Sequence, residues 1–208
     1  MKNYPRIYSL STLGLIHHYE NDYLFHNMRT DFVGDSGSGK SIIADLLQLI
    51  FVGSEMFESA TRTMDEKREL DGLVLRTPHK GIDIGYAFLN IEIQSRHYIV
   101  IGCYLESNSK RTKPFIIQGS SDPKANLLPI GQPLQTKDFK REGNICPLDD
   151  LLSQMEEKGL FLSYWETVKP YHRILYIHDI LPLDLASNEK TLKDYASVIR
   201  SFSRGKTI

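Results

Sequence analysis

Eight consecutive residues near the amino terminus have the types and spacing that bind phosphate. They match the pattern G-x-x-x-x-G-K-[ST] and are Gly34, Asp35, Ser36, Gly37, Ser38, Gly39, Lys40 and Ser41. A phosphate chain needs several N–H donors that converge on a small volume, and glycine allows such a nest because it has no Cβ atom. A helix starting at Lys40 would point its free N–H groups and positive dipole end at the same place. The segment therefore predicts a loop that binds nucleotide phosphates.

The last two residues of the pattern predict the ligand and the metal. Lys40 would reach the β- and γ-phosphates as the catalytic lysine, and the Ser41 hydroxyl would bind Mg²⁺. No Asn-Lys-x-Asp segment, which reads guanine, occurs in the 208 residues. We therefore expect ATP and Mg²⁺ as cofactors. The alternative is a glycine-rich turn that binds no nucleotide.

Hydrolysis would require further groups, and the sequence offers few. An acid that follows an apolar strand usually holds Mg²⁺, and Asp179 follows the apolar run 174–177. Isoleucine, not glutamate, occupies position 180, and the spacing of the run favours a short core helix over a strand. No Leu-Ser-Gly-Gly signature occurs either. We expect a chain that binds nucleotide but lacks the groups to hydrolyse it alone.

The elements around the loop mix strands and helices. A helix over Lys40–Phe51 is apolar on most sides, which predicts that it is buried. The last third reads as helical, with helices at Tyr171–Ile177 and after the possible caps Ser187 and Asn188. Runs of β-branched and aromatic residues predict a largely antiparallel sheet with strands at Arg6–Ile16, Asn21–Phe25, Arg29–Val33, Ile82–Ile93, His97–Leu105 and Phe115–Gln118.

Composition indicates a soluble protein of the cytoplasm. Hydrophobic residues make up 41% and charged residues 25%, and the net charge of -1 gives no general basic footprint for nucleic acid. No apolar stretch approaches the roughly 20 residues of a membrane helix, and the amino terminus lacks the apolar core of a signal peptide. The two cysteines, Cys103 and Cys146, have no metal-ligand spacing, which fits a reducing compartment.

Together these features resemble the amino-terminal half of the SMC-superfamily ATPase head, a group that includes Rad-type repair ATPases and the MukB and JetC proteins. The loop lies near the amino terminus behind a strand pair, and Ser41–Ile50 looks like the family's P-loop helix. A long antiparallel sheet follows over Ile84–Gln118, and Tyr171–Gly205 looks like the approach to a coiled coil. The resemblance implies an α/β P-loop NTPase fold of the ABC/SMC type.

The resemblance also implies an organisation and partners. Residues 1–145 would form the ATP-binding lobe with the antiparallel sheet, and residues 146–208 a helical segment leading toward the coiled coil. The missing motifs would lie in a carboxy-terminal half of the same head, and a second head would complete each ATP site. ATP-driven engagement of the two heads would then act on DNA, in maintenance, repair or antiphage defence.

Two further roles are implied by the resemblance alone. Gln118 would be the Q-loop glutamine that contacts the nucleotide and Mg²⁺, although a strand glutamine is the alternative. Arg62 or Arg68 would contact DNA or ATP, with a solvated loop arginine as the alternative. The pair His17-His18 reads as surface or strand histidines rather than a metal site, and Lys110–Lys113 reads as a solvated turn rather than a DNA contact.

Two other functions stay open from the sequence. One is a self-sufficient small P-loop kinase or NTPase, which would need Asp179 as a real Mg²⁺ ligand. Its weakness is the antiparallel middle of the chain, because such kinases alternate strands and helices more regularly. The other is a non-catalytic module that binds nucleotide only as a structural ligand or switch.

Overall fold

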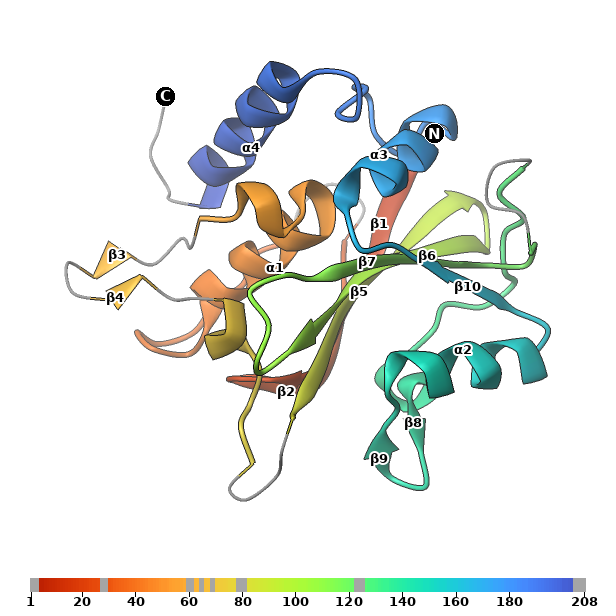
Figure 1. The fold of residues 1–208 in the computed structure, drawn as a ribbon, viewed down its shortest axis with the longest axis horizontal. Helices are drawn as coiled ribbons and strands as arrows, with labels where there is room; N and C mark the ends of the chain where they lie inside the picture. The colour runs from red at the N-terminus through yellow and green to blue at the C-terminus, as the bar shows by residue number, and fades with distance from the viewer. Residues whose placement is uncertain are drawn as a thin grey trace.

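The computed structural model describes residues 4–26, 30–58, 62–63, 66–67, 70–77, 82–121 and 126–203. Its largest element is a six-stranded sheet in which every neighbouring pair is antiparallel, in the order β10-β7-β6-β5-β1-β2 (Figure 1). This confirms the mixed α/β class and the antiparallel sheet expected from the sequence. The strands are β1 (Arg6–Leu15), β2 (His18–Leu24), β5 (Ile84–Gln94), β6 (His97–Glu106), β7 (Lys113–Gln118) and β10 (Phe161–Tyr164).

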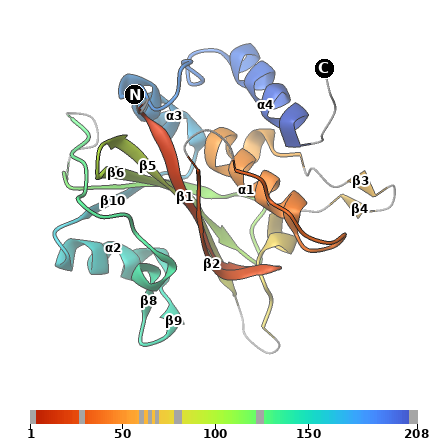
Figure 2. The same cartoon turned by 180° about the vertical axis from the view of Figure 1, so that it is seen from behind.

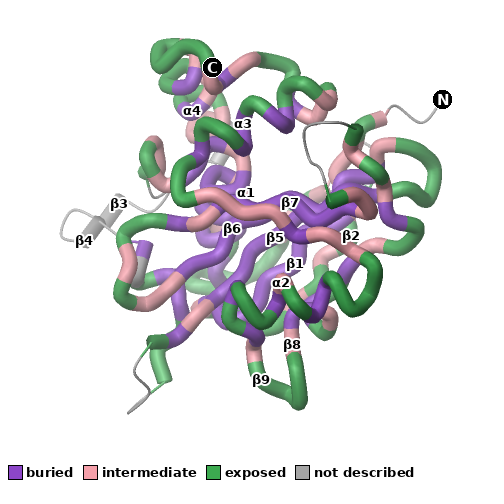
Figure 3. Tube along the Cα trace, turned by 45° about the vertical axis from the view of Figure 1, so that its right-hand side comes forward, coloured by how far each residue is buried: buried purple, intermediate pink, exposed green. Residues whose placement is uncertain are grey.

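Both faces of the sheet are buried. On β5, Ala87, Leu89 and Ile91 belong to one hydrophobic cluster, whereas Tyr86 and Phe88 belong to another. This alternation follows from the two-residue period of a strand. Figure 3 shows the central strands buried, with the exposed residues gathered in the outer segments. Because both faces need apolar side chains, β5 and β6 read as nearly continuous apolar runs in the sequence.

Three helices cover one face of the sheet (Figure 1). The first of them contacts β5 and β6 directly, and the last packs against the first. The middle helix is tied to the carboxyl end of the first, because the Tyr171 hydroxyl donates to the Ile50 carbonyl at 3.0 Å and the His172 Nε2 lies 2.9 Å from the Phe51 carbonyl. The helices are α1 (Lys40–Val52), α3 (Val168–Ile177) and α4 (Glu189–Ser203).

The other face is covered by the segment between β7 and β10, as Figure 2 shows from behind. The Asn90 side chain holds this segment to the sheet, since its amide exchanges two 2.8 Å hydrogen bonds with the backbone of Leu134. The Phe139 ring stacks on Phe88, with ring centroids 4.1 Å apart. The elements here are η3 (Thr136–Phe139), β8 (Lys140–Arg141), β9 (Asn144–Ile145) and α2 (Leu148–Glu157).

Short elements link α1 to β5. They are η1 (Ser54–Met56), β3 (Arg62–Thr63), β4 (Glu66–Lys67) and η2 (Leu70–Leu73). The end of α4 reaches this link, where Arg200 forms an ion pair with Glu58 at 3.2 Å. The Gln48 side chain on α1 also binds the backbone of Glu58 through both its amide groups.

The strand predicted at Arg29–Val33 is wrong for residues 30–33, which have no regular secondary structure; Arg29 lies outside the described residues. A strand needs a neighbour that accepts and donates its backbone hydrogen bonds. Among the described residues, the edge strand β2 pairs only with β1. Val33, directly before the loop, leaves 92% of its surface exposed. The apolar sequence therefore has strand propensity but no partner strand here.

The last third of the chain is not wholly helical, which corrects a second expectation. β10 pairs with β7, with Phe161 opposite Gln118, and so completes the sheet from the carboxy-terminal side. The chain turns toward this pairing after α2, where Gly159 has a φ of 70°. The expected cap of the final helix is confirmed, because the Asn188 side chain accepts from the Lys190 N–H at 2.8 Å.

Candidate functional site

The predicted phosphate loop is a surface turn directly before α1. Gly37 and Gly39 have φ values of 85° and 89°, in the left-handed region that glycine adopts without strain. The Ser38 N–H donates to the Asp35 carbonyl at 3.2 Å and closes the turn. Residues 34–38 are exposed, whereas Gly39 is buried. Gly37 and Gly39 thus occupy positions that require the conformational freedom of glycine.

The amino-terminal end of α1 is left without a side-chain cap. Gly39 is the N-cap residue, and the first turn contains no acidic residue. The free N–H groups at the start of a helix, together with the helix dipole, attract an anion. The exposed Lys40 ammonium donates to the carbonyls of Gly34 at 2.5 Å and Asp35 at 2.7 Å. A phosphate oxygen can replace these exposed bonds.

His18 anchors the loop, and the sequence analysis did not identify this role. Its Nε2 lies 2.9 Å from the Gly39 carbonyl, and its Nδ1 lies 2.7 Å from the Tyr23 hydroxyl. Because a carbonyl oxygen only accepts, the neutral ring carries its proton on Nε2, and the Tyr23 hydroxyl donates to Nδ1. Burial raises the pKa of Tyr23, which keeps that hydroxyl protonated. A Cβ atom on Gly39 would lie 2.6 Å from the His18 Nε2.

The site fits the phosphates of a nucleotide and a Mg²⁺ ion held largely through them. The uncapped start of α1, the left-handed glycines and Lys40 supply donors and positive charge. Ser41 is the second residue of α1 and is half-buried. Among the described residues, no group of three His, Cys, Asp or Glu could hold a metal ion by itself. Mg²⁺ commonly takes few protein ligands beside phosphate oxygens and water, and Ser41 is the residue here that would supply one.

The structure does not bring Gln118 to the loop. Gln118 is the last residue of β7 and is buried, and its Oε1 accepts from the Leu128 N–H at 3.1 Å. The strand registers align Leu13 with Lys113 across β5 and β6, so Gln118 lies at the other end of the sheet from Leu15. Strand spacings of about 4.8 Å and a rise of about 3.3 Å per residue put roughly 25 Å between Gln118 and Leu15. Gln118 therefore lies outside the candidate site.

Asp179 is not a Mg²⁺ ligand at the end of a strand. It follows α3, whose last residue is Ile177, so the interpretation as a short core helix is confirmed. α3 is fixed to the carboxyl end of α1 through Ile50 and Phe51. At a rise of about 1.5 Å per residue, that end of α1 lies roughly 15 Å or more from Lys40. The acid that a hydrolytic site needs is therefore not supplied by Asp179.

The arginines proposed to contact DNA or ATP stay predictions. Arg62 lies in β3, and Arg68 lies outside the described residues. The basic turn Lys110–Lys113 is linked to the segment before α3, because Lys113 forms an ion pair with Glu166 at 3.1 Å. His17 has a φ of 59° in the turn between β1 and β2.

The fold and the site together define a mixed α/β protein with an exposed glycine-rich loop directly before α1. The family model described as MukB N-terminal matches residues 6–206. The match covers nearly the whole chain, and the chain belongs to this family. Membership agrees with the resemblance to the amino-terminal half of an SMC-superfamily ATPase head.

A search of curated proteins finds no match. In the part of the chain that the structure describes, no helix combines the length and apolar character needed to cross a bilayer.

Proposed function

We propose that this chain is the ATP-binding half of an SMC-like ATPase head, which uses ATP-driven engagement of two heads to act on DNA. One observation carries the proposal. Glycines in the left-handed conformation precede α1, whose N-cap residue makes no side-chain bond and whose first residue is Lys40. The chain belongs to the MukB N-terminal family. Binding the β- and γ-phosphates would place Lys40 and Ser41 where the motif requires them. The net charge of -1 does not indicate an overall basic surface that binds DNA, so we assign DNA contact to the assembled heads.

The loop supplies binding but not a complete hydrolytic site. No Leu-Ser-Gly-Gly signature occurs in the 208 residues, and the run before Asp179 is helical. A carboxy-terminal half of the same head would supply the Mg²⁺-binding acid, and a second head would supply the signature. ATPase activity would therefore depend on both partners, and the cytoplasm is the compartment in which they would meet.

The surface beside the loop supports docking of such a half. Val33 is 92% exposed directly before Gly34, and Leu24 at the end of β2 is 66% exposed. β2 is the edge of the sheet, and an edge strand presents unpaired N–H and C=O groups. Docking of the missing half here would cover these apolar side chains. It would also give residues 30–33 the partner that a strand requires.

Replacing Lys40 tests the proposed function most simply. Lys40→Ala removes a charged donor to phosphate, and such hydrogen bonds contribute about 1.5–3 kcal/mol, so the Kd for Mg²⁺–ATP should rise at least about tenfold. Isothermal titration calorimetry measures this change. The Lys40 side chain is exposed, so the thermal midpoint should hardly move.

Lys190→Ala is the matched control, because Lys190 is also an exposed helical lysine but lies on α4. Its ATP affinity should equal that of the wild type. Equal affinities for all three proteins would mean that the loop does not bind the phosphates.

A further inference from the structure

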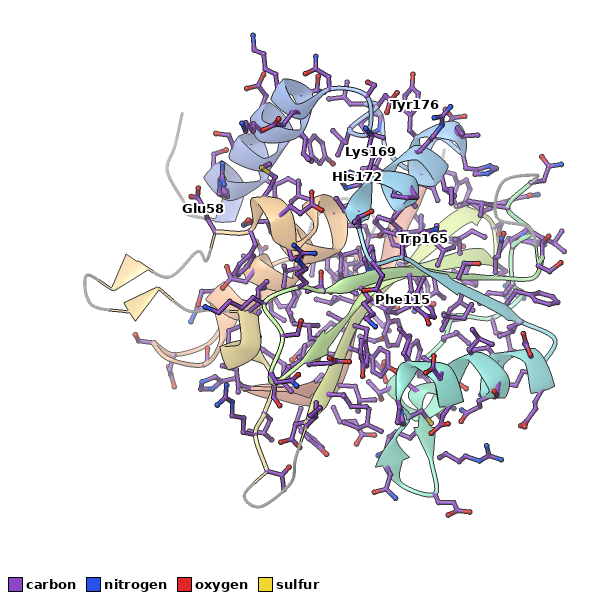
Figure 4. All side chains as sticks on the ribbon, viewed as in Figure 1. Glu58, Phe115, Trp165, Lys169, His172 and Tyr176 are labelled. Atoms are coloured by element: carbon purple, nitrogen blue, oxygen red, sulfur yellow. The ribbon has the colours of Figure 1, made fainter. Side chains whose placement is uncertain are left out.

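A cavity of about 980 Å³ lies at α3, apart from the phosphate loop. All of its lining residues fall within 165–187, so it is built by the segment entering α3, by α3 itself and by the segment that leads to α4. Its volume lies at the upper end of the range for ligand sites in proteins. Figure 4 shows Lys169 and Tyr176 on α3, with Trp165 just below the helix.

Two cations on α3, Lys169 and Arg173, line the cavity. Lys169 and Arg173 are four residues apart, so they share one face of the helix. Both are exposed, and neither forms an ion pair with any residue that the structure describes. Like charges at this spacing destabilise a helix by a few tenths of a kcal/mol. The pair is therefore electrostatically unfavourable until an anion lies between or beside the two side chains.

The acid of the cavity does not neutralise this pair. The Asp184 Oδ1 accepts from the backbone N–H groups of Ala186 at 3.0 Å and Ser187 at 3.2 Å. These bonds hold the carboxylate against its own turn. The lining thus contains two cations and one acid, a formal charge of +1 when His178 is neutral.

The remaining lining is apolar and aromatic. Trp165, Pro170 and Ile174 contribute to the cavity, and Ile177 and Tyr176 leave 55% and 41% of their surfaces exposed. Trp, Tyr and Arg are the residue types that dominate binding energy at protein interfaces. Nucleic-acid interfaces are instead strongly positive and polar, whereas this chain has a net charge of -1. The composition favours a protein ligand.

We propose that this cavity binds an acidic, amphipathic peptide segment of a partner protein. Apolar side chains of the segment would enter beside Trp165 and Ile177, and its carboxylates would pair with Lys169 and Arg173. The helix that presents these cations is rigidly held, because Tyr171 and His172 bond to the end of α1. The site is separate from the ATP-binding loop and goes beyond the proposed function.

The probe for this site is a fluorescein-labelled helical peptide of about 15 residues, with Leu and Phe on one face and Glu on the other. Binding to the full chain is followed by fluorescence anisotropy. The same peptide with Lys in place of Glu, and a thymidine oligonucleotide, are the comparison ligands. We expect the acidic peptide to bind, more weakly as salt is raised, and the basic peptide to bind at least tenfold more weakly.

Charge reversal identifies the site. The double variant Lys169→Glu and Arg173→Glu should weaken binding of the acidic peptide at least tenfold. Ile177→Asp, at an exposed position, should also weaken binding of the acidic peptide, because it removes an apolar contact. The matched control Lys190→Glu with Lys193→Glu changes the same charge on α4 and should leave binding unchanged. Lys40→Ala should also bind the peptide normally, which separates this proposal from the ATP-binding function.

Three results would overturn the proposal. One is no binding of the acidic peptide at concentrations up to about 1 mM, the limit of weak association. Another is equal binding by the charge-reversed protein and the control. The third is binding of the oligonucleotide in place of the peptide with loss in the Lys169→Glu and Arg173→Glu variant, which would assign the cavity to nucleic acid.

Discussion

Lys40 and His18 both bind backbone carbonyls of the phosphate loop, but in different surroundings. Lys40 is exposed and donates to Gly34 and Asp35, so it can move to a phosphate at little cost. His18 is buried and binds the carbonyl of Gly39, the N-cap of α1. Lys40 is therefore the residue that would touch nucleotide, whereas His18 is a positioning residue that fixes where the helix begins.

His18→Ala should weaken ATP binding several-fold. It removes the hydrogen bond to Gly39 and leaves the Tyr23 hydroxyl without its acceptor, at a cost of about 1–3 kcal/mol in the free energy of unfolding. Chemical denaturation gives the stability, and ATP titration gives the affinity of the folded fraction.

His18→Gln is the matched variant, because a glutamine amide offers a donor for the Gly39 carbonyl and an acceptor for Tyr23. It should recover most of the ATP affinity that His18→Ala loses. If folded His18→Ala binds ATP as tightly as the wild type, His18 has a structural role only.

At the scale of single residues, the sequence predicts the phosphate loop but not His18, the residue that holds the loop in place. The eight motif residues are adjacent in the chain, so their spacing alone predicts the turn. His18 reaches Gly39 from 21 residues away, and only the folded β1–β2 turn brings them together. Gln118 shows the converse, because the family resemblance alone suggested a nucleotide contact, yet the register of β7 places it at the other end of the sheet.

Among the elements, α1 connects the phosphate loop to the rest of the helical layer. Its first residue follows Gly39, and its last carbonyls accept from Tyr171 and His172 on α3. A Cβ atom on Gly53, just after α1, would lie 2.8 Å from the Val168 side chain. The two helices therefore meet closely where α1 ends.

His172, where α3 meets the end of α1, should make the free energy of unfolding fall as the pH is lowered. Burial lowers the pKa of His172 to about 4, opposed by its hydrogen bond to Phe51. An unfolded histidine titrates near 6.5, so between these values the unfolded state binds a proton that the folded state does not. The free energy of unfolding should drop by at most about 3 kcal/mol from pH 7 to pH 4 through this group, at about 1.4 kcal/mol per pKa unit.

Urea denaturation of the wild type and His172→Gln over this pH range isolates the effect. Glutamine keeps a donor for the Phe51 carbonyl but does not titrate. The wild type should lose more stability than the variant as the pH falls from 7 to 4. Identical pH profiles would show that His172 does not contribute.

The spacing of residues predicts a helix or strand only where the sequence of that segment alone contains the full pattern. The apolar spacing of 40–52 and the Asn188 cap before α4 predict those helices within one or two residues. Residues 30–33 have the composition of a strand, but the partner that would pair with them is not among the described strands. β10 is only four residues long, too short to show a period, and its identity comes from pairing with β7.

The whole molecule is built around one six-stranded sheet, and other elements cover each face of that sheet. The helical layer holds the phosphate loop and the α3 cavity, and the second layer is built by 126–157. Phe139 is central to the second layer, because it is fully buried and contacts Phe88, Tyr86 and Phe115. Phe139 lies in the stretch 119–141, which is rich in Pro and Gly and has the sequence of a loop, so its core position could not be predicted from local sequence.

Phe139→Ala should lower the free energy of unfolding by about 3–5 kcal/mol, the usual cost of removing a buried aromatic ring. ATP affinity of the folded fraction should not change, because the loop lies on the other layer. Urea denaturation and ATP titration give the two values. A loss below about 1 kcal/mol would mean that Phe139 is not packed in this core.

Steady-state ATP hydrolysis, measured before and after the proposed carboxy-terminal half of the head is added, tests the central claim most directly. The chain alone should bind Mg²⁺–ATP and turn over almost none of it. The combined halves should hydrolyse ATP, and Lys40→Ala should abolish that activity. Equal turnover by the chain alone and by the combined halves would contradict the assignment as half of an ATPase head.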